Sequence, residues 1–308
     1  MLVVIDGLTP EALEHGLAEG RLPALATLSE AGWSGRGTSV FPSLTPVCLT
    51  SIATGAYPDV HHIPHLVWYH RGERRVIEYG SSFPAMRAVG ARRAIRDTIF
   101  GMSGEHVSPQ ATTVFEALED AELEPAAINF TCYRGRTRHT IRLPALARRN
   151  RWYEAVQGPK HFFYFNLFES ERTGAPLAIR SRLEGSIDEY AAFVGRWLVT
   201  RDAFDFLVFY LPDYDYASHI VGPERALQRE REPARELRHG AERCVVGIEQ
   251  ALEVRLRHDQ QVAVADGLDV HEGEHAVVLV NDLVNRGLIL RSTTSRATTR
   301  RHDGQCAQ

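Results

Sequence analysis

The sequence predicts an α/β fold, with a mostly parallel central sheet and helices on both of its faces. Three apolar runs of strand length, residues 2–6, 204–213 and 260–266, each end in aspartate. Short apolar runs of this kind are the pattern of buried strands. Segments with helix start and stop signals stand between the runs, and this strand–turn–helix rhythm predicts a parallel sheet.

Three helices are predicted near the N-terminus. Residues 9–20 begin with a Thr-Pro pair and end in glycine, which are start and stop signals of a helix. Residues 24–32 predict a second, short helix. Thr45 and Pro46 repeat the Thr-Pro start and predict a third helix, with Thr45 as its N-cap. The glycine-rich residues 32–37 lie between the last two and predict a turn.

The middle of the chain is less regular. Residues 66–109 are rich in arginine, glycine and aromatic residues and predict an insertion over one end of the sheet. Residues 112–123 form an amphipathic helical pattern, and residues 125–133 predict the strand after it. We therefore expect residues 66–200 to include inserted cap segments within a single domain.

Beyond the second apolar run, residues 229–258 predict a charged helix. Residues 275–289 predict a strand followed by a helix, and the polar residues 292–308 predict a loose tail. No internal repeat divides the chain, so residues 1–308 are expected to form a single α/β domain.

Composition excludes several function classes. The chain is 44% hydrophobic and 24% charged with a net charge of −4, which predicts neither a nucleic-acid polymer nor a membrane as partner. No apolar run reaches the ~18 residues of a membrane span. The four cysteines have no paired spacing, and the first residues form a strand rather than a leader, so we expect a cytoplasmic protein. The sequence leaves the oligomeric state open.

Acidic residues gather where the predicted strands end. Asp6, Asp213 with Asp215, and Asp266 follow the three apolar runs, and the carboxyl ends of parallel strands meet at one edge of a sheet. Carboxylates that converge there favour a bound cation, because they otherwise repel one another. His219 is four residues after Asp215, so both face the same way on a helix. An oxygen with an imidazole favours zinc, manganese or iron over magnesium. Taken alone, the pair is more typical of a helix cap and a surface histidine. Its place after a buried strand, with a second aspartate, favours the metal.

Thr45 has two interpretations as well. As an N-cap it stabilises its helix by ~1 kcal/mol. As a nucleophile it stands beside the unpaired N–H groups and the positive end of the helix dipole, which favour phosphate. A metal ion nearby lowers the pKa of such a hydroxyl.

Taken together, these motifs resemble the alkaline phosphatase superfamily, and within it the type I phosphodiesterase/nucleotide pyrophosphatase group. Residues 52–63, IATGAYPDVHHI, are similar to that group's TG-x-YP-x-x-HGI segment, and Thr45 stands nine residues before the TG, where the group has its nucleophile. Residues 210–223, YLPDYDYASHIVGP, are similar to its PD-x-x-GH-x-x-GP segment. The resemblance covers the core up to about Asp266, and each motif alone is weak.

The resemblance implies a metal-dependent phosphoester hydrolase that acts on small phosphorylated substrates. Two divalent ions, zinc or alternatively manganese, would be held at two subsites. Asp6, Thr45 and Asp266 would form one, and Asp215 with His219 the other. Thr45 would attack phosphorus. The same resemblance implies that diesters or nucleotide pyrophosphates are preferred over monoesters as substrates.

One motif departs from the family pattern. The third segment of the family has Asp-His, whereas this chain has Asp266 and Gly267, so one imidazole is absent. His271 and His275 are near enough in sequence to replace it. The resemblance therefore also allows a second metal site that is weak, and a shortened or catalytically impaired member that only binds phosphate or metal. A phosphomonoesterase remains a further alternative.

Other polar clusters carry weaker signals. His61, His62 and His65 are typical of a loop near the phosphate site, and we do not include them among the metal ligands. The basic residues 136–139 and 148–152 could bind an anionic substrate but are more typical of solvated charge.

Overall fold

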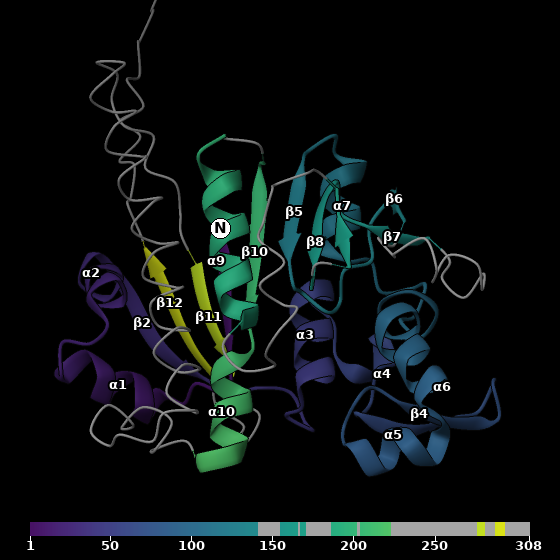
Figure 1. Ribbon diagram of the computed structural model, residues 1–308. Helices are drawn as coiled ribbons and strands as arrows, with labels where there is room; N and C mark the ends of the chain where they lie inside the picture. Colours follow the sequence, from purple (N-terminus) through teal and green to yellow (C-terminus); the bar gives the residue numbers. More distant parts are fainter. Residues whose placement is uncertain are drawn as a thin grey trace, which may run out of the picture.

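The computed structural model describes residues 1–140, 155–165, 167–170, 186–201, 204–222, 276–280 and 287–292. Its described residues contain an eight-stranded sheet in the order β2-β12-β11-β1-β10-β5-β8-β9 (Figure 1). These strands are β1 (Leu2–Asp6), β2 (Gly32–Gly37), β5 (Pro125–Ile128), β8 (His161–Tyr164), β9 (Phe168–Glu169), β10 (Phe206–Leu211), β11 (Ala276–Val280) and β12 (Gly287–Ser292).

The central strands run parallel, as the sequence predicts. β1 pairs in parallel with both β10 and β11, and the parallel pairing continues from β10 through β5 to β8. Antiparallel strands close both edges: β12 and β2 on one side and β9 on the other. The strands β11, β1 and β10 therefore end at the same edge of the sheet.

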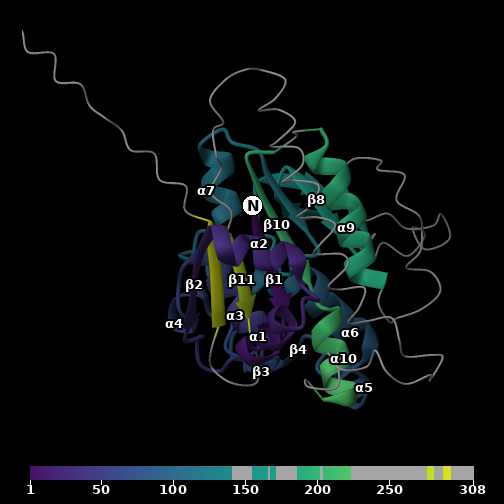
Figure 2. The same cartoon turned by 90° about the vertical axis from the view of Figure 1, so that its left-hand side faces the viewer.

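Helices cover both faces, which confirms the predicted layers. They are α1 (Pro10–Ala18), α2 (Pro23–Ala31), α3 (Thr45–Thr54), α7 (Val114–Asp120), α9 (Ser186–Val199) and α10 (Asp213–Val221). Val3 and Ile5 of β1 pack in one core cluster with α1, α2 and α9, whereas Val4 packs in a second cluster with α3 and α7. Alternate residues of a strand point to opposite faces, so β1 contributes to both clusters. Figure 2 shows α7 and α9 on opposite sides of the sheet.

The predicted irregular region, residues 66–109, is instead regular. It contains the hairpin β3 (Val67–His70) and β4 (Arg75–Glu78), then α5 (Phe83–Val89), α6 (Ala91–Arg96) and the π-helix η1 (Asp97–Glu105). These elements follow α4 (Pro58–His61) in the sequence, and both views show α5, α6 and β4 close together (Figures 1 and 2). The sequence signal fails because these elements are short and depend on contacts between one another.

One such contact is an ion pair. Arg75 donates two hydrogen bonds of 2.7 Å to the carboxylate of Asp97, which is 1% exposed. A paired geometry of this kind is among the stronger polar contacts in proteins. It joins β4 to the first residue of η1, which the sequence gives no means to foresee.

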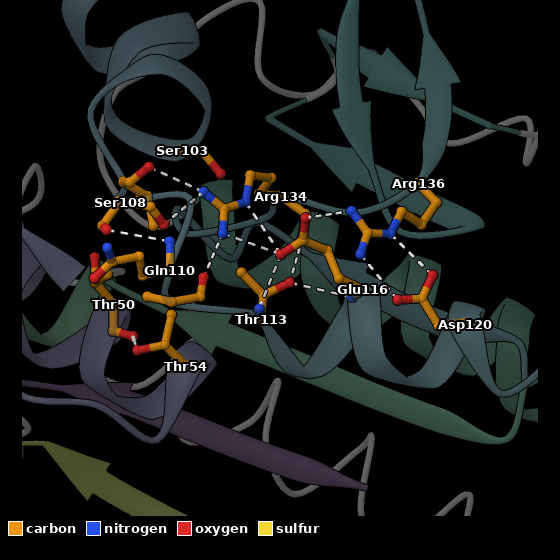
Figure 3. A network of polar contacts seen from close by, with 12 residues as sticks. Thr50, Thr54, Ser103, Ser108, Gln110, Thr113, Glu116, Asp120, Arg134 and Arg136 are labelled. Atoms are coloured by element: carbon orange, nitrogen blue, oxygen red, sulfur yellow. Dashed lines mark hydrogen bonds and ion pairs between the residues drawn. The ribbon is translucent and has the colours of Figure 1, made fainter. Parts of the chain in front are cut away.

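A second polar network stabilises the region around α7 (Figure 3). Arg134 Nε donates to Glu116 Oε2 at 3.1 Å and Arg134 Nη1 donates to the carbonyl of Val107 at 3.0 Å. Glu116 also completes a capping box with Thr113 at the start of α7. Arg136 donates to the other oxygen of Glu116 at 2.9 Å. These arginines therefore stabilise the start of α7. The next elements in the sequence after them are β6 (Thr137–His139) and β7 (Val156–Gly158), which form a small antiparallel sheet.

Two further local predictions are wrong. Residues 32–37 form the edge strand β2 rather than a turn, because they pair with β12 from far along the chain. Residues 287–289, expected in a helix, belong to β12. The predicted helix 229–258, the predicted strand 260–266 and the tail from 293 onward lie outside the described residues. Within the described part of the chain, no helix is long and apolar enough to cross a membrane.

Candidate active site

Thr45 and Asp6 meet at the carboxyl edge of the sheet. Asp6 is the last residue of β1 and is 2% exposed, and Thr45 is the first residue of α3. The Thr45 hydroxyl Oγ1 donates a hydrogen bond of 3.0 Å to Asp6 Oδ2. The two residues are 39 positions apart in the sequence. The fold therefore brings together two residues that the sequence predicts for one subsite.

The predicted role of Thr45 as an N-cap is wrong. Leu44 occupies the N-cap position of α3, and no side chain forms a cap hydrogen bond there. Thr45 lies one residue inside the helix, with Pro46 in the same first turn. Its hydroxyl points to Asp6 instead of the helix backbone. The N–H groups of the first turn therefore receive no bond from a side-chain cap, and such groups favour an anion.

Asp215 and His219 form the second predicted pair. Both lie on α10, and His219 Nε2 is 3.3 Å from Asp215 Oδ2, as the four-residue spacing predicts. The Asp215 side chain is 10% exposed, whereas that of His219 is 58% exposed. Burial raises the pKa of Asp215 and His219 opposes that rise. Among the described residues, the buried atom Asp215 Oδ1 has no hydrogen-bond partner. A cation would satisfy that atom.

Gly7 brings Asp215 close to the end of β1. Gly7 has φ of +71°, in the left-handed region that favours glycine. A Cβ at Gly7 would lie 2.7 Å from Asp215 Oδ1 and 3.1 Å from Asp215 Cα. Only a residue without a side chain allows α10 to approach this closely. The two residues of the Asp-Gly sequence at the end of β1 therefore have separate roles. Asp6 supplies a carboxylate, and Gly7 leaves space for Asp215.

Asp213 has a different local role from the one predicted. Its Oδ2 accepts a hydrogen bond of 3.0 Å from the backbone N–H of Asp188, in the first turn of α9. Asp188 Oδ1 accepts one of 3.3 Å from the N–H of Asp213 in return. The two buried carboxylates therefore join the starts of α9 and α10. Asp213 fixes the helix that carries Asp215.

The carboxylates nevertheless share one neighbourhood. Although Tyr216 is 51% exposed, desolvation raises the pKa of its phenol to about 12, and the negative charges of Asp6, Asp215, Asp213 and Asp188 contribute in that order. Charges contribute measurably only at short range. The four carboxylates therefore lie near enough to Tyr216 to raise the pKa of its phenol, as expected for the end of a parallel sheet.

The donor set is suited to a metal but is incomplete within the described residues. Asp6, Asp215 and His219 offer oxygen and imidazole ligands of the kind that zinc and manganese take. No group of three or more such side chains is close enough to hold a metal ion in the part of the chain that the structure describes. Asp266 and Gly267 lie outside that part. The histidines expected to replace the missing ligand, His271 and His275, lie outside it too.

The strand beside β1 offers another acidic residue that sequence reasoning missed. β11 runs parallel to β1, with Val280 opposite Asp6, so it ends at the same edge. In the sequence Val280 is followed by Asn281 and Asp282, which lie outside the described residues. The run 276–282 is an apolar run that ends in aspartate, the same signal as in the other strands, although residues 275–289 are predicted as a strand and helix.

The histidine cluster is structural where it is buried. His61 is fully buried, and its Nδ1 accepts a hydrogen bond of 3.1 Å from the N–H of Ile63. Its Nε2 lies 3.0 Å from Ser51 Oγ. Burial, followed by the neighbouring His62, lowers the pKa of His61 to about 4. A neutral imidazole with both nitrogens in use supports its exclusion from the metal ligands.

Fold and site geometry together define an α/β protein of the alkaline-phosphatase-like class. A family model described as type I phosphodiesterase/nucleotide pyrophosphatase matches residues 1–260. The chain belongs to this family. Among curated protein sequences, none matches the chain.

Two of the similar solved structures, with TM-scores above 0.5, show the same fold. Murine ectonucleotide pyrophosphatase/phosphodiesterase 5 is similar with a TM-score of 0.52 at 13% identity, over 91% of this chain and 56% of that one. The human protein of the same name gives 0.51 at 12% identity, with 91% and 56% covered. Phosphonoacetate hydrolase from Sinorhizobium meliloti 1021 gives 0.47 at 17% identity, over 90% of this chain and 54% of that one. The chain thus spans a little over half the length of these structures.

Proposed function

We propose that the protein is a metal-dependent phosphoester hydrolase with Thr45 as its nucleophile. The observation that carries this proposal is the hydrogen bond of 3.0 Å between Thr45 Oγ1 and Asp6 Oδ2, formed at the start of α3. A hydroxyl there has a carboxylate beside it and helix N–H groups close by. The first activates an oxygen nucleophile, and the second stabilise negative charge on a phosphoryl group.

The residues of this chain would divide the work as follows. Thr45 Oγ1 would pass its proton to Asp6 Oδ2 and form a bond to phosphorus, while the bond from phosphorus to the leaving oxygen breaks and that oxygen takes up a proton from water. Water then cleaves the phosphothreonine ester and releases Thr45. Asp6, Thr45 and Asp266 would hold one divalent ion, and Asp215 with His219 the other. Zinc or manganese bound there would neutralise the phosphoryl oxygens and favour the ionised hydroxyl.

The third carboxylate has two candidates. Asp266 follows an apolar run whose position is outside the described residues. Asp282 is the second residue after Val280, and Val280 pairs with Asp6. We propose Asp282 as the ligand that completes the Asp6 subsite if Asp266 does not.

The substrate class is a small phosphorylated molecule, with diesters or nucleotide pyrophosphates proposed over monoesters. An AMP complex of an inactive variant of the murine protein supports a small phosphorylated ligand, and family membership supports the preference for diesters. A nucleic-acid polymer is not proposed as substrate, and we place the protein in the cytoplasm. A second candidate, an impaired member that binds phosphate or metal without turnover, is favoured by Gly267 at the position of a family histidine.

Hydrolysis assays test the proposal. We expect the purified protein to hydrolyse an aryl phosphodiester with zinc or manganese added, faster than the matching monoester. A chelator should remove the activity and Thr45→Ala should abolish it. Thr54→Ala is the control, because Thr54 lies in the same helix and donates to the carbonyl of Thr50 at 2.7 Å, away from Asp6. Metal binding without turnover would support the second candidate. Failure to bind zinc or manganese would refute the enzyme, and failure to bind phosphate as well would refute both.

Comparison of two carboxylate variants identifies the third ligand. Asp282→Asn and Asp266→Asn remove one charge each, and the true ligand should weaken zinc binding by about 10-fold or more. Gly267→His should raise zinc affinity or rate if the absent imidazole limits the site. Equal zinc affinity in all three variants and the wild type would exclude both acids.

A further inference from the structure

Tyr210 lies beside Asp6 on the neighbouring strand. In the parallel pairing of β1 and β10, Tyr210 is opposite Val4, so Tyr210, Val4 and Asp6 face the same side of the sheet. That side is the one covered by α3, since Val4 and Tyr210 share a core cluster with Leu49 of α3. The side chains of Tyr210 and Asp6 are therefore diagonal neighbours below the start of α3. No sequence motif pointed to this tyrosine.

The Tyr210 hydroxyl donates to the same oxygen that Thr45 uses. Tyr210 OH lies 2.5 Å from Asp6 Oδ2, and Thr45 Oγ1 lies 3.0 Å from it. A hydroxyl that donates to a carboxylate forms a short, charge-assisted bond of this length. Asp6 Oδ2 thus accepts two hydrogen bonds, one from the Tyr210 hydroxyl on β10 and one from the Thr45 hydroxyl on α3. The two donors fix both the position and the rotation of the carboxylate.

Such fixing has a physical purpose. The last torsion of an aspartate is broad, so a carboxylate rotates unless a partner holds it. Tyr210 is 4% exposed and lies on β10, which pairs with β1 on one side and β5 on the other, whereas Thr45 starts a helix at the site edge. The Tyr210 hydroxyl therefore holds the Asp6 carboxylate from within the sheet. Because this hydroxyl is hydrogen-bonded to Asp6, Tyr210 acts through that carboxylate.

We infer that Tyr210 is a positioning residue, which holds Asp6 Oδ2 where it accepts the hydrogen bond of Thr45 and orients Asp6 as a ligand. The inference rests on the proposed function of the Thr45 site. Partners that orient a metal ligand from behind typically change metal affinity or activity by 10- to 100-fold when they are removed. Tyr210 would affect both metal affinity and activity through the carboxylate of Asp6.

Tyr210→Phe tests the inference because it removes only the hydroxyl. We expect kcat for the aryl phosphodiester to fall by about 10- to 100-fold with KM within about 2-fold, and zinc to bind about 10-fold more weakly by calorimetry. Tyr133→Phe is the matched control: it removes another buried tyrosine hydroxyl, whose partner is the carbonyl of Ile99. The control should keep the kcat and zinc affinity of the wild type.

The outcomes separate this inference from the proposed function. If the wild type hydrolyses the diester and Tyr210→Phe has the same kcat and zinc affinity, Tyr210 has no positioning role. If both tyrosine variants lose kcat and thermal stability to the same extent, the effect is general destabilisation and the inference is also overturned. If the wild type neither binds zinc nor hydrolyses the diester, the proposed function itself fails.

Discussion

Replacing Gly7 with alanine would test how closely α10 must approach β1. The wild-type backbone has φ of +71° at Gly7, and an added Cβ would lie 2.7 Å from Asp215 Oδ1. The left-handed conformation costs a non-glycine residue about 1–2 kcal/mol. Overpacking a tight site costs a further ~1–3 kcal/mol. We therefore expect Gly7→Ala to lose about 2–5 kcal/mol in the free energy of unfolding.

Gly20→Ala separates the two costs. Gly20 has φ of +68°, close to that of Gly7, but nothing lies within 4 Å of a Cβ placed there. Only the backbone cost of about 1–2 kcal/mol applies to it. The difference between the variants measures the contact with Asp215.

Urea denaturation of both variants gives these free energies. Calorimetric titration with zinc adds a second measurement, because displacement of Asp215 should weaken metal binding in Gly7→Ala and leave it unchanged in Gly20→Ala. The reasoning is refuted if the two variants lose the same free energy and bind zinc equally well. In that case α10 does not depend on the missing side chain.

Two further predictions concern the segment after α3. His62 is exposed and has φ of +65° at the end of α4, where the family segment has glycine. His62→Gly should therefore raise the free energy of unfolding by about 0.5–1 kcal/mol in urea denaturation. A lower free energy of unfolding would show that the His62 backbone is not strained. The pKa of His61 is lowered to about 4, so the unfolded chain takes up a proton below pH 6.5 that the folded protein does not. The contribution of His61 is therefore present above pH 6.5 and is lost as the pH falls toward 4, at up to ~1.4 kcal/mol per pH unit. His61→Asn removes this dependence, so its stability deficit relative to wild type should shrink from pH 7 to pH 5; a constant deficit would show that His61 does not titrate as described.

Much of the fold and part of the site could be predicted from the sequence. Buried strands require consecutive apolar residues, and Thr-Pro and glycine punctuate helices, so β1, β10, α1 and the parallel sheet follow from local pattern. Asp215 and His219 also follow, because a helix places residues four apart on one face. The elements of the insertion could not be predicted in this way. β3, β4 and η1 are short, and the contact between Arg75 and Asp97 joins residues that are 22 positions apart.

The sequence by itself determined which residues are chemically able to form the site: the aspartates that end strands, a helix-start threonine and an Asp-x-x-x-His turn. Only the tertiary structure decided their partners. Thr45 donates to Asp6 rather than capping α3, Tyr210 reaches the same carboxylate, and β11 takes the place beside β1. These choices depend on strand order and on contacts between residues far apart in the sequence, such as Tyr210 and Asp6 at 204 positions, and a local pattern carries no information about either.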